Sequence, residues 1–91
     1  KPAAICASAR RAGTTTTLDQ LVKYPEFFHM PLVSGSYWPM VHGRSVEDVR
    51  QDAEGLQIMR VLGTNMAWML QATSAAPAPN VEQKIMTSFI R

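Results

Sequence analysis

Apolar and polar residues alternate along this chain in a way that predicts two strands, each followed by a helix. Residues 3–7 and 30–34 are short apolar runs, and their length favours strands over helices. The first run is apolar on both faces, as a strand covered on both sides is. Between the runs, Leu18, Leu21 and Val22 form a helical stripe, and the pair Thr17 and Gln20 has the form of a capping box.

The helical pattern changes at Pro25, which should end the first helix at Tyr24 or restart it as a separate turn through Phe27 and Phe28. A second, longer helix is predicted over residues 46–72, opened by the capping pair Ser45 and Asp48. Its apolar positions recur every three or four residues: Val49, Ala53, Leu56, Met59, Leu62, Met66 and Met69. Gly55 and Gly63 are expected to be tolerated weak points that cost about 1 kcal/mol each against alanine.

The order of these elements predicts the α/β class, as a βαβα portion of a parallel sheet. Two strands do not make a stable sheet alone, so we expect a larger domain or an obligate assembly, with the chain as an incomplete piece. Residues 1–76 form the domain portion in this interpretation. Residues 77–91 form a Pro/Ala linker and a tail that docks through Ile85, Phe89 and Ile90.

Composition narrows the class of protein. The chain has 91 residues, of which 46% are hydrophobic and 18% charged, a balance typical of one globular domain. A formal net charge of +2 is too small to predict binding to nucleic acid or to an anionic membrane. No apolar run approaches the roughly 20 residues that span a bilayer. Cys6 is the single cysteine, which excludes a multi-cysteine zinc site and favours the cytoplasm.

Candidate binding residues follow each predicted strand. The loop after the first strand, "SARRAGTTTT", carries Arg10, Arg11 and Gly13 ahead of a helix start, where backbone N–H groups favour negative charge. The second strand leads into "SGSYWPMVHG", which holds Tyr37 and Trp38. Because parallel strands present their carboxyl ends together, both loops are expected at one edge, as one site with a cationic side and an aromatic side. The alternatives are a solvated arginine loop, aromatic side chains that only pack, and Cys6 as a small core residue.

Four stretches together resemble the carboxyl-terminal half of the flavodoxin-like NAD(P)H-dependent FMN reductases, the group that includes the iron–sulfur flavoproteins. They are "KPAAICASARRAGTTTTLDQL", "MPLVSGSYWPMVHG", "EDVRQDAEGLQIMRVLGTNMAWML" and "TSFIR". The resemblance implies a doubly wound sheet of five parallel strands with FMN at the strand carboxyl ends, and a protein that oligomerises. It also implies hydride transfer from NAD(P)H to a quinone or flavin-type acceptor. The cofactor-binding residues that it implies are Ser8, Ala9, Arg10, Arg11, Gly13, Thr14, Thr15, Tyr37 and Trp38.

The chain departs from this family in two respects. Pro39 stands where the family has asparagine after the Tyr-Trp pair, and the amino-terminal half, with the loop that holds the FMN phosphate, is not in this sequence. The resulting prediction is a fragment of an FMN-dependent oxidoreductase that supplies the loops beside the isoalloxazine ring, with no catalytic residue assigned. The alternative is a non-catalytic remnant or interaction module that oligomerises through exposed strand edges.

Overall fold

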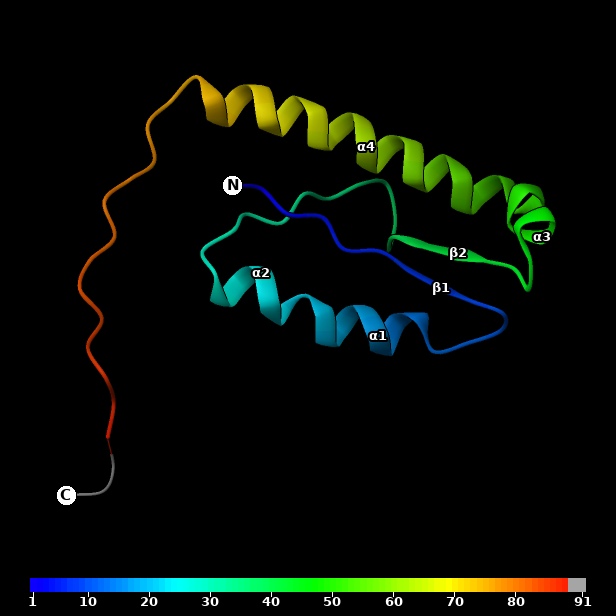
Figure 1. The fold of residues 1–91 in the computed structure, drawn as a ribbon, viewed down its shortest axis with the longest axis horizontal. Coiled ribbons are helices and arrows are strands. Elements are labelled where there is room, and N and C mark those ends of the chain that lie inside the picture. The colour runs from blue at the N-terminus through cyan, green and yellow to red at the C-terminus, as the bar shows by residue number, and fades with distance from the viewer. Residues whose placement is uncertain (89–91) are drawn as a thin grey trace.

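The chain forms a small mixed α/β unit, described here over residues 1–88 by a computed structural model. Along the chain, the elements are β1 (Ala7–Ala9), α1 (Thr14–Leu21), α2 (Lys23–Phe27), β2 (Met40–His42), α3 (Val46–Gln51) and α4 (Ala53–Ser74). β1 and β2 pair in parallel, with α1 and α2 on one side of the pair and α4 on the other (Figure 1). The predicted α/β class and the parallel pairing are therefore confirmed.

The strands lie later in the chain than the apolar runs predicted. Ala7 pairs with Met40 and Ala9 with His42, whereas the predicted strand at residues 3–7 contributes one isolated bridge, from Ala3 to Leu32. The predicted second strand, 30–34, was therefore wrong beyond that bridge. From the Ala3–Leu32 bridge to the Ala7–Met40 pair, the first segment advances by four residues and the second by eight. The second segment is longer because the chain around residues 34–39 leaves the sheet. Pro39 rejoins it, and its carbonyl accepts a bond of 3.0 Å from the Ala7 N–H.

The helices cover the two faces of the strand pair unevenly. Ile5 lines an apolar groove with Leu18 of α1 and with Val22, which follows that helix, so the odd-numbered side chains of residues 3–9 face α1. Val41, the partner of Ser8, lies against α4 at Gly55. The even-numbered side chains share the face of Val41, but α4 packs mainly on β2, and Ala4, Cys6 and Ser8 are exposed. The expectation that Cys6 is a core residue was therefore wrong.

Helix α1 begins three residues before the predicted Thr17. Gly13 stands at its N-cap with φ 98°, a left-handed conformation that glycine adopts without strain. The Thr17 hydroxyl donates to the Gly13 carbonyl at 2.8 Å inside the helix, instead of capping it. The break falls at Val22, between α1 and α2, and buried Pro25 lies in the first turn of α2, where a missing N–H costs no helical bond. A separate turn does follow the first helix, but the predicted break at Tyr24 was wrong, because Tyr24 and Pro25 both lie inside α2.

The predicted long helix over residues 46–72 is two helices, α3 and α4, separated at Asp52. Ser45 caps α3 as predicted, because its hydroxyl accepts from the Asp48 N–H at 3.3 Å. Asp52 caps α4 by accepting from the Gly55 N–H at 3.0 Å, and its other oxygen accepts from the His42 N–H at 2.8 Å. The carboxylate therefore fixes the start of α4 to the end of β2.

The apolar core is small. Its buried side chains are Leu18, Val33, Ile58 and Leu62, of which Ile58 was missing from the predicted stripe, whereas Ala53 of that stripe is exposed. The accessible surface is 7700 Å², while a compact chain of this mass exposes about 5300 Å². The radius of gyration is 16.9 Å against about 12 Å for a compact domain of this length. The chain is therefore less compact than a typical globular domain of the same length.

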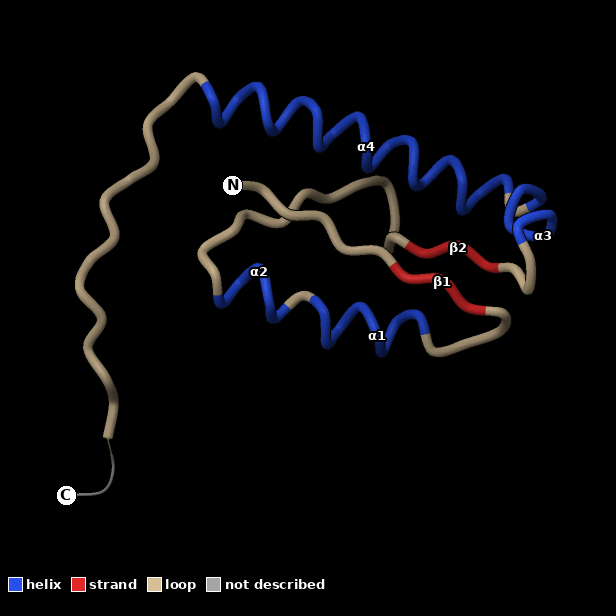
Figure 2. Tube along the Cα trace, viewed as in Figure 1, coloured by secondary structure: helices blue, strands red, loops and turns tan. Residues whose placement is uncertain are grey.

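The carboxyl-terminal segment runs away from the sheet after α4 ends (Figure 2). Ile85, predicted to dock, is 87% exposed, and Lys84 places Nζ 5.7 Å from the Phe27 ring centroid. Residues 81–85 also line a cavity with Phe27 and His29. Phe89 and Ile90, the other predicted docking residues, lie outside the described residues. Within residues 1–88, no helix is both long and apolar enough to cross a membrane.

Candidate functional site

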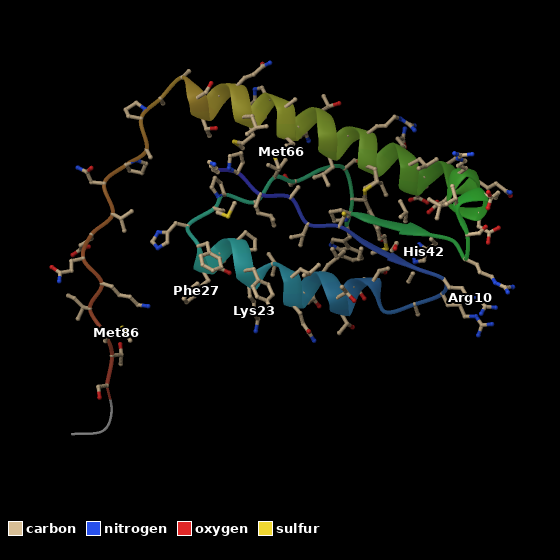
Figure 3. The ribbon with its side chains drawn as sticks, in the orientation of Figure 1. Arg10, Lys23, Phe27, His42, Met66 and Met86 are labelled. Carbon is tan, nitrogen blue, oxygen red and sulfur yellow. The ribbon has the colours of Figure 1, made fainter. Side chains whose placement is uncertain are left out.

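The bend after the carboxyl end of β1 carries two adjacent cationic side chains. Arg10 and Arg11 are exposed in the bend that follows β1. Figure 3 shows Arg10 at the carboxyl end of β1, directed away from the sheet. Gly13 then opens α1, and a Cβ built on it would meet no atom within 4 Å, so the backbone there is accessible. The first N–H groups of α1 have no helical acceptor and favour a negatively charged neighbour. Together these groups suit a ligand that presents an anionic or carbonyl-rich side.

Among the predicted binding residues of β1 and α1, some side chains already pack within the fold and others are exposed to a ligand. Thr14 is 5% exposed, and its hydroxyl donates to Met40 Sδ at 3.3 Å, so it packs α1 against β2. Thr15 is exposed and lies in the first turn of α1. In β1, Ser8 is exposed and Ala9 is half-buried opposite His42. Of the predicted binding residues in this loop, Thr14 is thus the one whose hydroxyl is committed to the fold.

Tyr37 and Trp38 lie before β2, at its amino end, whereas Arg10 follows the carboxyl end of β1. The expectation that both loops open at one edge was therefore wrong, and its cause is the departure of the chain from the sheet before Pro39. The two rings pack on each other with centroids 4.9 Å apart, and they are 53% and 59% exposed. They border an apolar groove of about 550 Å³, which Leu18 and Val33 also line.

Sequence reasoning missed the junction of Asp52 with the end of β2. The hydrogen bond from the Gly55 N–H, then that from the His42 N–H, lowers the pKa of Asp52 below its ordinary value, while desolvation opposes the change and the charge of His42 assists it. A cavity of about 200 Å³ lies beside this carboxylate, with Tyr37, His42 and Glu54 in its wall. The available signal was the Asp52-Ala-Glu-Gly55 stretch, an aspartate at a cap position ahead of a helix.

The site can be tested for its fit to the FMN that the sequence resemblance implies. Arg10, Arg11 and the open backbone at Gly13 suit the carbonyl-rich pyrimidine side of an isoalloxazine ring. Tyr37 and Trp38 do not join them, so the aromatic side of the predicted site does not fit. Within residues 1–88, no three His, Cys, Asp or Glu side chains gather as a metal site. No protein-family model, curated protein or solved structure matches this chain.

Proposed function

We propose that the chain supplies the cationic half of an FMN site in an oxidoreductase of the flavodoxin-like NAD(P)H-dependent type. The observation that carries the proposal is the Arg10–Gly13 bend, which joins the carboxyl end of a parallel strand to the amino end of α1. In open α/β sheets, ligands bind beyond the carboxyl ends of the strands, at such bends. The sequence resemblance supports the same position, and with it a five-stranded sheet completed by residues outside this chain.

Each residue has a defined task in this proposal. Arg10 and Arg11 bind the pyrimidine carbonyls and favour negative charge on that side of the ring, while Gly13 lets the backbone approach it. Thr15 offers an exposed hydroxyl beside the same N–H groups. Bound FMN would supply hydride transfer from NAD(P)H to a quinone or flavin-type acceptor. The cytoplasm is the compartment that this chemistry and the single thiol favour.

The experiment is a titration of the chain with FMN, followed by quenching of flavin fluorescence. Binding should be weak, because this chain brings half of the site. Arg10→Ala and Arg11→Ala should weaken it further, each by about fivefold, since a charge near 4 Å contributes about 1 kcal/mol in a solvated site. Arg60→Ala, an exposed arginine of α4, is the matched control and should leave the titration unchanged. If all four proteins titrate alike, the arginine bend does not bind the flavin.

A second candidate function is an interaction module that assembles through strand edges. The observation that favours it is the amount of apolar surface left in solvent: Tyr24, Phe27, Phe28, Trp38 and Trp68 are each more than half exposed. Exposed apolar surface on this scale marks interaction sites in soluble proteins. This candidate needs no cofactor, so the FMN titration separates the two.

A further inference from the structure

The strand pair has two outer edges, and they differ in how their backbone groups are satisfied. At the outer edge of β2, the His42 N–H donates to the Asp52 carboxylate at 2.8 Å. A charged side chain beside an edge strand prevents another strand from pairing there. The outer edge of β2 is therefore closed by the residue that also caps α4.

The outer edge of β1 has no such protection. Ala3, Ala7 and Ala9 direct their backbone bonds toward the segment 31–43, as shown by Ala7 N–H to Pro39 at 3.0 Å and Gly43 N–H to Ala9 at 3.1 Å. Because a strand alternates the direction of its backbone groups, those of Ala4, Cys6 and Ser8 point to the other edge. Among residues 1–88, the sheet has no strand on that side. Residues 2–9 also contain no charged side chain to oppose pairing.

We propose that two copies of this chain pair through the free edges of residues 4–8, in antiparallel orientation. A two-fold axis at Cys6 would set Ala4 of each copy opposite Ser8 of the other, so the meeting side chains are small and uncharged. The strand count then rises from two to four, above the three that a sheet needs for independent stability. This inference deepens the interaction candidate and needs no flavin, and it uses the edge of β1 that a completed five-stranded sheet would also need, so it applies to the chain by itself.

The chain exposes more surface than a compact chain of its mass. The accessible surface exceeds that of a compact chain by about 2400 Å², part of which belongs to the extended segment after α4. A stable interface takes about 800 Å² from each partner, a third of that excess. The face beside the free edge is also open, because Ala4, Cys6 and Ser8 are exposed there. Edge pairing and burial of this face would occur together.

The pairing also predicts an unusual response to salt. With the axis at Cys6, Lys1 of one copy lies near Arg11 of the other at each end of the paired segment, and these exposed like charges repel. Salt screens such repulsion over a Debye length of about 10 Å at 0.1 M. The affinity between the two copies should therefore rise with salt concentration. A different partner, with acidic residues flanking its strand, would instead bind more weakly as salt concentration rises.

The test is sedimentation of the full chain over a range of concentrations, comparing wild type with Cys6→Pro and Cys6→Ala. Proline removes the N–H that faces the free edge and costs no bond to β2, so it should weaken the dimer about tenfold or more through two lost bonds across the axis. Alanine keeps that N–H and should retain the dimer. If Cys6→Pro fails to fold, Cys6→Lys keeps the backbone donor and places two like charges across the axis, which should give the same loss.

Mild oxidation supplies a geometric readout. Directly opposed residues in a hydrogen-bonded antiparallel pair have Cα atoms about 5.5 Å apart, within the range of a disulfide. Wild-type dimer should therefore form a Cys6–Cys6 disulfide faster than the urea-unfolded chain does. A monomeric wild type, a dimer that survives both Cys6→Pro and Cys6→Lys, or a dimer weakened by salt would each overturn the inference. None of these outcomes bears on the FMN titration, so the two proposals fail separately.

Discussion

The two glycines of α4 should respond to alanine in opposite directions. At Gly63, an added Cβ meets nothing within 4 Å, so alanine brings its higher helix propensity without a clash. Propensity alone contributes about 1 kcal/mol to the free energy of unfolding. For a domain of this size, that corresponds to a rise in Tm of about 4–8 °C. The expectation from sequence that both glycines are merely tolerated therefore holds for Gly63.

At Gly55, the same methyl group enters an occupied space. Its Cβ would overlap the Asp52 carboxylate, lie 2.8 Å from the carboxylate carbon, and lie 2.9 Å from Val41 Cγ1. Overpacking of this kind costs about 1–3 kcal/mol, which meets or exceeds the propensity gain of about 1 kcal/mol. Relief of the clash also moves the Asp52 carboxylate away from the His42 N–H, from which it accepts a hydrogen bond. Gly55→Ala should therefore lower Tm by several degrees.

Thermal unfolding followed by far-UV circular dichroism, at one fixed protein concentration, measures both variants. Fixed concentration is needed because association shifts Tm by mass action. The double variant should show nearly additive effects, since the two positions share no contact. If Gly55→Ala raised Tm as much as Gly63→Ala did, α4 would not approach β2 closely at Gly55, and the packing argument would be refuted.

Three further predictions concern single residues. Asp52→Asn should lower Tm at pH 7, and the difference in Tm from wild type should shrink as pH falls. The lowered pKa of folded Asp52 gives stability that is fully present above the ordinary value of 3.8 and is lost as pH drops through the folded-state pKa. Thermal melts at a series of acidic pH values would measure this difference. Gly13→Ala should cost about 1–2 kcal/mol in urea unfolding, because φ 98° is strained for an L-residue; an unchanged midpoint would contradict that conformation. In the flavin-loaded form that the proposed function requires, Arg10→Ala or Arg11→Ala should make the midpoint potential more negative by tens of millivolts, about 30 mV for each 1.4 kcal/mol in a two-electron couple. A potential unmoved by both substitutions would contradict their place at the ring.

The sequence predicted the order of elements better than their bounds. Apolar runs and helical stripes identify strand, helix, strand and helix, because burial requires those periodicities. They could not reveal that Ala7 pairs with Met40, since the register depends on how far the chain departs from the sheet between Leu32 and Pro39. The periodic pattern also continues through Asp52, and the break there depends on a hydrogen bond to His42, a residue ten positions away.

The candidate site was predictable where it depends on local sequence. A glycine ahead of a threonine-rich helix start placed the Arg10–Gly13 bend at a strand end, as the structure has it. The role of Thr14 was not predictable, because its hydroxyl acceptor is Met40, 26 positions away. The separation of Trp38 from Arg10 follows from the sheet register, so it could not be read from either loop alone.

The departure of the chain from the sheet also gives the molecule a place that tolerates insertion. The Ala3–Leu32 bridge and the Ala7–Met40 pair fix the chain before and after residues 34–39, and Asn65 holds the Ser34 carbonyl at 2.8 Å. Lengthening a loop between fixed ends costs little, about 0.6 kcal/mol for each doubling. A short epitope or a fluorophore-binding sequence inserted after Ser36 would therefore report on the chain in cells without shifting either strand.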